Sequence, residues 1–305
     1  MRRVLTTGVF LLLLAGSPAG LAQPASTQLV HAAGMARDLP FPDEPVNPAA
    51  LSAPRMALLK PDGPGPFPAL VLQHQCGGLG NARWQNRSML EWARRAVERG
   101  YVALLVDSLG PRGVESVCMG PRGGVNLMRG VRDAHQAAEH LRRFDFVDKE
   151  RVALAGFSWG AMIGVLASSR HWGNSVGYGS RFAAVVSLYP GCFTIRPPGS
   201  GAYEIVNNDI DRPLLVLMGE KDNETPADEC VSRLERARAN GAPVEWHVYP
   251  GLTHCWDCES LDGFSKVDFR GNHVVYRYDR DATEDASRRV FDFLRARLAL
   301  PARPQ

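Results

Sequence analysis

The chain has 305 residues, of which 45% are hydrophobic and 22% are charged, and its formal net charge is +3. This is an ordinary balance for a globular protein, and one large α/β domain can accommodate the whole length. A small positive charge spread over such a length gives no reason to expect nucleic acid or an anionic membrane as a partner.

The N-terminus has the pattern of a secretory signal peptide. Met1-Arg2-Arg3 supplies positive charge, Val9 to Ala15 is an unbroken apolar run, and Gly20-Leu21-Ala22 offers small residues for a signal peptidase. We therefore expect residues 1–22 to be removed. The apolar run is too short to span a bilayer, so no membrane contact is expected after cleavage. The pattern predicts an exported protein, either periplasmic or secreted.

The rest of the chain alternates between apolar runs and helical patterns. Residues 23–54, rich in Pro and Ala, are predicted to be an extended N-terminal arm, and residues 55–300 one α/β domain. Strands are expected at 55–60, 69–74, 101–106, 152–155, 182–188, 213–218 and 244–249, helices at 84–99, 126–144, 226–240 and 283–298, and a hairpin at 264–278. Most of the strands are continuous apolar runs, which is typical of a mostly parallel central sheet with helices on both faces.

One motif organises the chemistry of the chain. The apolar run Val152 to Ala155 leads into Gly156-Phe157-Ser158-Trp159-Gly160, and a helical run of small residues follows. This is G-x-S-x-G between a strand and a helix, the arrangement known as a nucleophile elbow. The turn is so tight that the residues two before and two after the serine must be small. The alternative is an ordinary glycine-bounded loop with an incidental serine.

A serine hydroxyl needs a base, and the base needs an acid to orient it. After this motif the expected order is an acid and then a histidine. Asp222 follows the predicted strand at 213–218, although Glu220 and Glu224 are rivals and a solvated acidic turn is the structural alternative. His254 follows the next strand. Because both lie where reactive groups gather in such sheets, Asp222 and His254 are the candidates for acid and base.

Acyl transfer also requires N–H donors for the oxyanion of the tetrahedral intermediate. The backbone N–H of Trp159, directly after the serine, is the first candidate. The second should come from the loop after the strand at 69–74. There we expect the N–H of Cys76, with that of Gln75 as the next candidate. The alternative for Gly77-Gly78 is a plain turn that ends the strand.

Six cysteines in an exported chain suggest disulfides, and the sequence alone cannot choose among their pairings. They are Cys76, Cys118, Cys192, Cys230, Cys255 and Cys258. The pair Cys255-x-x-Cys258 resembles half of a zinc site, but no second pair of ligands accompanies it. We therefore expect a structural bridge there, and neither a metal nor an organic cofactor.

Together these motifs resemble the dienelactone hydrolase family of α/β-hydrolases. They are His74-Gln75-Cys76-Gly77-Gly78, Val106-Asp107-Ser108-x-Gly110-Pro111-Arg112-Gly113, the elbow, Gly219-x-x-Asp222-x-x-x-Pro226 and Tyr249-Pro250-Gly251-x-x-His254, and they span about residues 55–298. The resemblance implies an α/β-hydrolase fold with Ser158, Asp222 and His254 as a catalytic triad. Two residues depart from the family pattern. The nucleophile is Ser158 where the name-giving enzymes use cysteine, and Gln75 stands where glycine is common.

The fold implied by the resemblance also suggests a disulfide pattern. Cys76 and Cys118 would lie on loops after neighbouring strands, as would Cys192 and Cys230, which leaves Cys255 and Cys258 as a local pair.

The sequence thus predicts an exported serine hydrolase that acts on small carboxylic esters. A lactone, a peptide or a polysaccharide acetyl group could be cleaved by the same residues. A non-catalytic binding protein on this fold is a further alternative, and the oligomeric state is not readable from the sequence.

Overall fold

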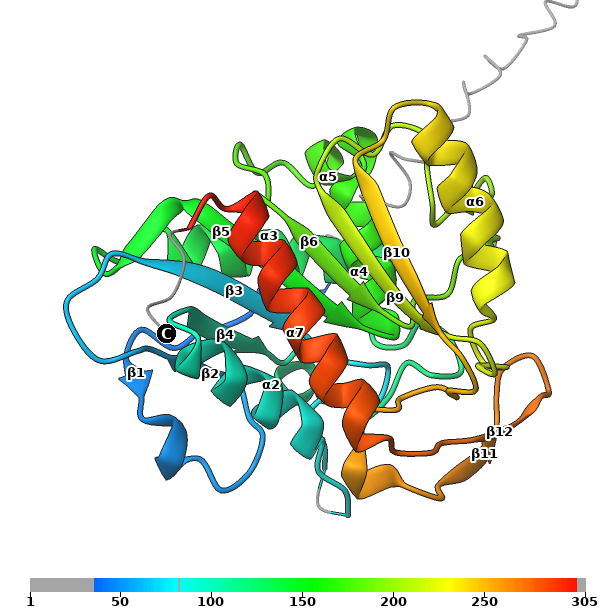
Figure 1. Cartoon of the computed structure of the whole chain (residues 1–305), viewed down its shortest axis with the longest axis horizontal. Coiled ribbons are helices and arrows are strands. Elements are labelled where there is room, and N and C mark those ends of the chain that lie inside the picture. Colours follow the sequence, from blue (N-terminus) through cyan, green and yellow to red (C-terminus); the bar gives the residue numbers. More distant parts are fainter. Residues whose placement is uncertain (1–35, 82, 301–305) are drawn as a thin grey trace, which may run out of the picture.

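An eight-stranded sheet runs through the centre of the molecule (Figure 1). The computed structural model describes residues 36–81 and 83–300, so the predicted signal peptide lies outside the described residues. In spatial order the strands are β1 (Pro45–Val46), β2 (Ala57–Leu59), β4 (Val102–Val106), β3 (Phe67–Gln73), β5 (Val147–Phe157), β6 (Val185–Leu188), β9 (Leu214–Gly219) and β10 (Val244–Tyr249). The six strands from β4 to β10 are parallel, whereas β2 pairs antiparallel with β4. The predicted fold class is confirmed.

The apolar strands explain why both faces of the sheet are covered. Every residue of β4 and β9 is buried. Along β3, Ala69 and Val71 belong to one hydrophobic cluster, while Leu70 and Leu72 belong to the other. Because successive side chains of a strand point to opposite faces, a strand without polar residues needs a helical layer on each side.

Six α-helices supply these layers in the described part of the chain. α2 (Arg87–Glu98) and α7 (Arg280–Arg297) pack on the face nearer the viewer in Figure 1. On the other face lie α3 (Leu127–Leu141), α4 (Trp159–Ser168), α5 (Arg170–Ser175) and α6 (Ala227–Ala239). α7 begins before the predicted position because the Asp279 side chain accepts a hydrogen bond from Ala282 N and caps the helix.

Two small ribbons stand outside the main sheet. The predicted hairpin is confirmed as β11 (Ser265–Val267) paired with β12 (His273–Val275). The ribbon of β7 (Thr194–Ile195) and β8 (Tyr203–Glu204), together with α5, was missed. These elements contain too few residues for a periodic pattern to predict them. β1 and the 3-10 turn η1 (Pro48–Ala50) lie within the segment predicted as an arm, and β1 pairs with β2. The described residues also form the 3-10 turns η2 (Gly110–Arg112) and η3 (Glu259–Leu261).

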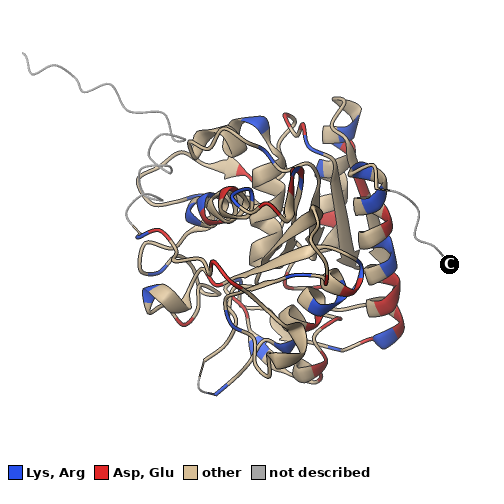
Figure 2. Cartoon of the chain, turned by 90° about the vertical axis from the view of Figure 1, so that its left-hand side faces the viewer, with Lys and Arg blue, Asp and Glu red and all other residues tan. Residues whose placement is uncertain are grey.

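Charged residues of both signs are mixed over the face shown in Figure 2, most visibly along the helix that leads to the C-terminus. Within residues 36–81 and 83–300, no helix combines the length and the apolar character needed to cross a bilayer.

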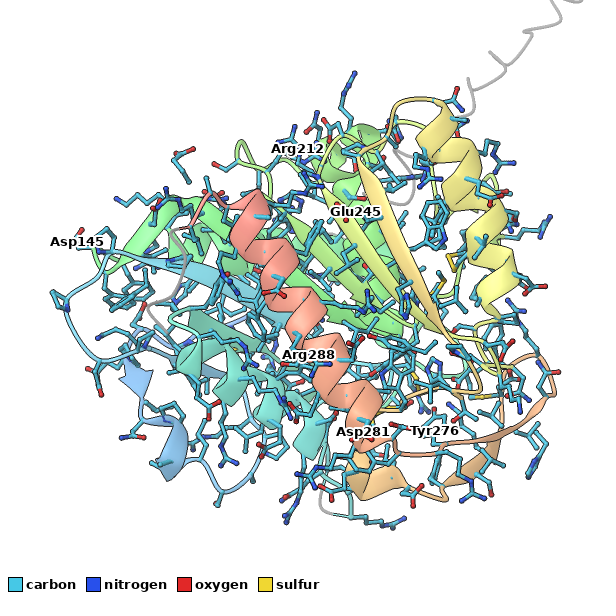
Figure 3. The ribbon with its side chains drawn as sticks, in the orientation of Figure 1. Asp145, Arg212, Glu245, Tyr276, Asp281 and Arg288 are labelled. Carbon is cyan, nitrogen blue, oxygen red and sulfur yellow. A yellow bond between two sulfur atoms is a disulfide. The ribbon has the colours of Figure 1, made fainter. Side chains whose placement is uncertain are left out.

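The parallel strands begin at one end of the sheet and finish at the other. In Figure 3, Asp145, Arg212 and Glu245 lie at the ends where β5, β9 and β10 begin, while Tyr276 lies at the opposite end, near the hairpin. The loops that follow the parallel strands gather at this second end, which is where ligands bind in open α/β sheets.

Candidate active site

Ser158 occupies the sharp turn between β5 and α4, with a backbone φ of 51° and ψ of −111°. The flanking glycines make this turn possible. A Cβ on Gly156 would lie 2.0 Å from the carbonyl oxygen of Gly160, and a Cβ on Gly160 would lie 2.1 Å from that of Gln73. A non-glycine residue with positive φ is strained and persists only where the surrounding packing enforces it. Here the buried strand and helix hold the serine in this conformation.

His254 and Asp222 meet Ser158 from two other loops. His254, which follows β10, has Nε2 3.0 Å from Ser158 Oγ and Nδ1 2.6 Å from Asp222 Oδ2. The structure thus brings the three residues of the predicted triad into one hydrogen-bonded chain. Asp222 and His254 are only 3% and 2% exposed, so water competes little with these contacts.

The carboxylate of Asp222 is fully hydrogen-bonded. Its Oδ1 accepts from the backbone N–H groups of Glu224 and Thr225, at 3.0 and 2.8 Å. Its Oδ2 accepts from the Thr225 hydroxyl at 2.8 Å and from His254. Thr225 Oγ1 also lies 3.1 Å from His254 Nδ1. Because a buried carboxylate needs such partners, Thr225 fixes the orientation in which Asp222 faces the imidazole.

The two rival acids have other positions. Glu220 is exposed and accepts a hydrogen bond from Gly251 N in the turn that precedes His254. Glu224 is buried, and its Oε2 is 3.9 Å from His254 Nε2, whereas Asp222 contacts Nδ1. Its carboxylate pairs with Lys266 Nζ at 2.7 Å and accepts from the Tyr276 hydroxyl at 2.9 Å.

These carboxylates control the charge of the imidazole. Burial lowers the pKa of His254, but the negative charges of Asp222 and Glu224 outweigh burial, and its pKa lies above the ordinary histidine value. For the carboxyl group of Glu224 burial acts in the other direction and raises the pKa. The contacts with His254, Lys266 and the Tyr276 hydroxyl outweigh burial, so the pKa of Glu224 lies below the ordinary glutamate value. Glu224 therefore stays ionised beside the ring.

The loop after β3 carries the predicted oxyanion donors Cys76 and Gln75. Cys76 is bonded to Cys118, and its carbonyl accepts from Val117 N at 2.9 Å. The buried side chain of Gln75 donates to the Tyr189 hydroxyl at 3.2 Å and accepts from Asn86. These bonds hold the backbone of the loop in place. Trp159 is the first residue of α4, so its N–H has no partner within the helix.

The cysteines form three disulfides, Cys76–Cys118, Cys192–Cys230 and Cys255–Cys258, which are the pairs that the resemblance suggested. The sulfurs of Cys255 and Cys258 lie near the carboxylate of Asp257. Since the two sulfurs are bonded to each other, they are not thiolate ligands for a metal, and the expected structural bridge is confirmed.

A buried polar network lies behind the histidine. Asp257 accepts hydrogen bonds from the Tyr189 hydroxyl and from Trp92 Nε1, both at 2.8 Å, and burial raises its pKa. The ring of Tyr189 packs edge-on against His254, with 4.7 Å between the ring centroids. Through Gln75, this network joins the histidine loop to the loop after β3.

Sequence reasoning assigned no role to Thr225, Tyr189 or Asp257, and quoted His74 only as part of a family motif. Buried His74 accepts from Ser108 N at 3.0 Å and lies 2.6 Å from Gln75 O, so it links two loops at the site. A threonine three residues after a candidate acid was a weak signal for Thr225. The other three act through contacts between distant loops, which no local pattern reveals.

Two cavities open beside Ser158. One, of about 290 Å³, lies against Trp159 and Met162. The other, of about 340 Å³, lies against His254 and Lys266. Ser158, Cys76 and Cys118 line both cavities, so a bound molecule can pass over the serine with one part in each.

The chain matches a family of known proteins over most of its length. A family model described as "Dienelactone hydrolase family" matches residues 55–298. A "Putative carboxymethylenebutenolidase" of Yersinia pestis is 23% identical over 249 residues, covering 77% of this chain and 81% of that protein. A "Probable dipeptidyl-aminopeptidase B" of Fusarium vanettenii is 25% identical over 224 residues, which is 68% of this chain but only 23% of that longer protein.

Solved structures share the fold. A thermophilic esterase of Thermogutta terrifontis, with propionate bound, superposes with a TM-score of 0.58 at 14% identity, covering 82% of this chain and 91% of the other. At this identity the likeness concerns the fold.

Proposed function

We propose, since the chain belongs to the dienelactone hydrolase family, that it cleaves carboxylic esters through a covalent acyl-enzyme formed on Ser158. The observation that carries this proposal is the continuous chain from Ser158 Oγ through His254, at 3.0 Å, to Asp222, at 2.6 Å. Such a chain gives a hydroxyl a base, and gives the base an orienting acid. The esterase name of a structural neighbour is in keeping with this chemistry.

In the proposed reaction, Ser158 Oγ attacks the acyl carbon while His254 Nε2 takes its proton. Asp222 holds the imidazole and stabilises the imidazolium that forms. The N–H groups of Trp159 and Cys76 would bind the oxyanion, each worth about 3–4 kcal/mol. His254 then gives the proton to the leaving alcohol, and a water molecule, activated by the same nitrogen, hydrolyses the acyl-enzyme.

Lactones, peptides and polysaccharide acetyl groups could be cleaved by the same residues, and a panel of these substrates beside p-nitrophenyl esters separates them. A fluorophosphonate probe tests the alternative of a non-catalytic binding protein, because it labels only an activated serine.

The decisive experiment replaces the proposed nucleophile. Ser158→Ala should lower kcat/KM for p-nitrophenyl acetate by about 10⁴-fold or more and abolish fluorophosphonate labelling. The matched control is Ser52→Ala, at an exposed position distant from Ser158 in the sequence. It should leave both kcat/KM and the fluorophosphonate labelling unchanged. If the folded Ser158→Ala protein keeps most of the activity, the proposed mechanism is wrong.

A further inference from the structure

We propose that the substrates are esters of an apolar acid with a polar, hydroxylated alcohol, and that the two halves bind in separate cavities on either side of Ser158. This inference rests on the proposed function, and it names the substrate class from the side chains that line each cavity.

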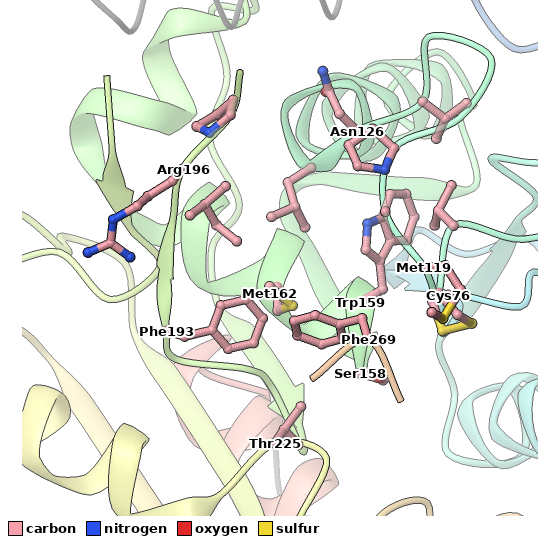
Figure 4. Close-up of a pocket in the computed structure, with 18 of the residues that line it drawn as sticks. Cys76, Met119, Asn126, Ser158, Trp159, Met162, Phe193, Arg196, Thr225 and Phe269 are labelled. Atoms are coloured by element: carbon pink, nitrogen blue, oxygen red, sulfur yellow. A yellow bond between two sulfur atoms is a disulfide. The ribbon is translucent and has the colours of Figure 1, made fainter. Parts of the chain in front are cut away.

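The first cavity is a hydrophobic chamber. Its wall is formed by Trp159, Met162, Phe193, Tyr203 and Phe269, among other apolar residues. Figure 4 shows the rings of Phe193 and Phe269 side by side near Met162, with the ring of Phe269 on the side of Ser158. Their centroids are 5.5 Å apart. Aromatic and thioether groups gain energy by covering apolar surface, so this chamber suits an apolar acyl group, and in particular one with a ring.

The charges near this chamber are occupied or turned away. Glu224 is paired with Lys266, and Arg270, which lies over the rings of Phe193 and Phe269, is paired with Glu229. In Figure 4 the guanidinium of Arg196 extends away from the aromatic rings. An acyl group with a second carboxylate would lose its hydration here without gaining a partner, so the chamber disfavours acidic acyl groups.

The rim of the site is also apolar. Four large hydrophobic side chains are exposed in the part of the chain that the structure describes: Met119 (74%), Phe264 (44%), Val267 (61%) and Phe269 (47%). Met119 and Phe269 line the first cavity and Phe264 the second, while Val267 belongs to the same hairpin. Clustered exposed hydrophobic groups mark binding sites, and here they extend the apolar surface toward the mouth.

The second cavity has a different lining. Asn81, Glu115 and Ser116 contribute polar groups, and Trp84 and Tyr276 contribute aromatic rings. Hydroxyl groups need donors and acceptors when they leave water, while the carbon skeleton of a polyol can pack on a ring face. This combination suits an alcohol that carries several hydroxyl groups.

The position of the histidine decides which half of the ester enters each cavity. His254 lines the second cavity. In the proposed mechanism its Nε2 donates a proton to the departing oxygen, so the alcohol must leave on that side. The acyl group remains attached to Ser158 and occupies the hydrophobic chamber.

Four esters test the assignment: 3-phenylpropanoate and acetate, each as the 1-glyceryl and the butyl ester. We expect glyceryl 3-phenylpropanoate to have the highest kcat/KM, at least tenfold above butyl acetate. Met162→Trp should fill the chamber and lower the ratio of phenylpropanoate to acetate turnover at least tenfold with either alcohol. Glu115→Leu should instead lower the ratio of glyceryl to butyl ester at least fivefold with either acyl group.

Circular dichroism and fluorophosphonate labelling verify that each variant folds. Should Met162→Trp fail to fold, Phe193→Ala, which removes one wall of the chamber, should lower the same acyl ratio. The proposal is overturned if a chamber variant changes the alcohol ratio instead, or if the wild type lacks these preferences. Wild-type protein that is labelled but cleaves none of the four esters refutes the substrate class alone, whereas absence of labelling refutes the proposed function itself.

Discussion

His254 lies between two carboxylates, Asp222 on Nδ1 and Glu224 3.9 Å from Nε2. The first is the acid expected from chain order. The second, which the sequence offers as a rival acid, lies beside the other ring nitrogen. Because Glu224 is ionised and held by Lys266 and Tyr276, it places negative charge beside the nitrogen that would carry the proton in catalysis.

Glu224→Gln should therefore change the pH dependence of activity. His254 must be neutral to act as a base, so activity is lost as the pH falls through its raised pKa. Removing the charge of Glu224 lowers that pKa, and the acid limb of the kcat/KM profile should move to lower pH. The control Glu220→Gln, at an exposed acid that accepts a hydrogen bond from Gly251 N, should leave the acid limb at the same pH. An unchanged limb in Glu224→Gln would contradict the electrostatic role.

The glycines of the elbow are a second feature at this scale. In Gly160→Ala the new Cβ would lie 2.1 Å from the backbone oxygen of Gln73, which cannot move without displacing β3. We expect a loss of about 1–3 kcal/mol or more in the free energy of unfolding, measured by urea denaturation. Gly179→Ala, where a Cβ meets nothing within 4 Å, is the control and should cost little. Equal stability of the two variants would show that the turn tolerates a side chain.

At the scale of elements, the site is built from loops, and two disulfides hold three of these loops. Cys76–Cys118 joins the loop after β3 to the loop after β4, with a sequence separation of 42. Cys192–Cys230 ties the loop after β6 to α6, with a separation of 38. The two bridges close loops of similar length, so their entropic contributions to stability should be similar.

This similarity separates stability from positioning. The double variant Cys76→Ser/Cys118→Ser and its counterpart Cys192→Ser/Cys230→Ser should each lose about 2–4 kcal/mol of stability. Only the first frees the loop with the proposed oxyanion donor, so it alone should lower kcat for p-nitrophenyl acetate, by about tenfold or more. Thermal melting and steady-state kinetics measure the two effects. Equal losses of kcat in both variants would remove the positioning role.

At the scale of the whole molecule, three disulfides on one chain are consistent with export, since such bonds persist in oxidising compartments. Cleavage after Ala22 remains a prediction from the sequence. The bridges lie at the end of the sheet where the site is, so we expect the oxidation of the cysteines to be coupled to the assembly of the site.

Expression of the full chain in a bacterial host should place the protein in the periplasm, with Gln23 as its first residue. The denatured protein should show no free thiol before reduction, and reduction should lower its melting temperature. N-terminal sequencing, thiol titration and calorimetry measure these outcomes. A cytoplasmic protein that retains Met1 would contradict the predicted signal peptide.

Much of the fold was predictable because local patterns encode it. Buried strands such as β4 and β9 are apolar throughout, and the elbow demands glycine on both sides of Ser158. The short elements α5, β7 and β8 were not predictable, since few residues carry too little periodicity. Their formation depends on packing against the finished core.

The sequence by itself determined the alternation of strands and helices, the tight turn at Ser158 and the chain order of the candidate triad, because these depend on neighbouring residues. Only the tertiary structure decided that Thr225 orients Asp222, that Glu224 faces the other ring nitrogen, and that two unlike cavities flank the serine. Those features are contacts between loops far apart in the chain. Their geometry exists only once the parallel strands have brought their carboxyl ends together.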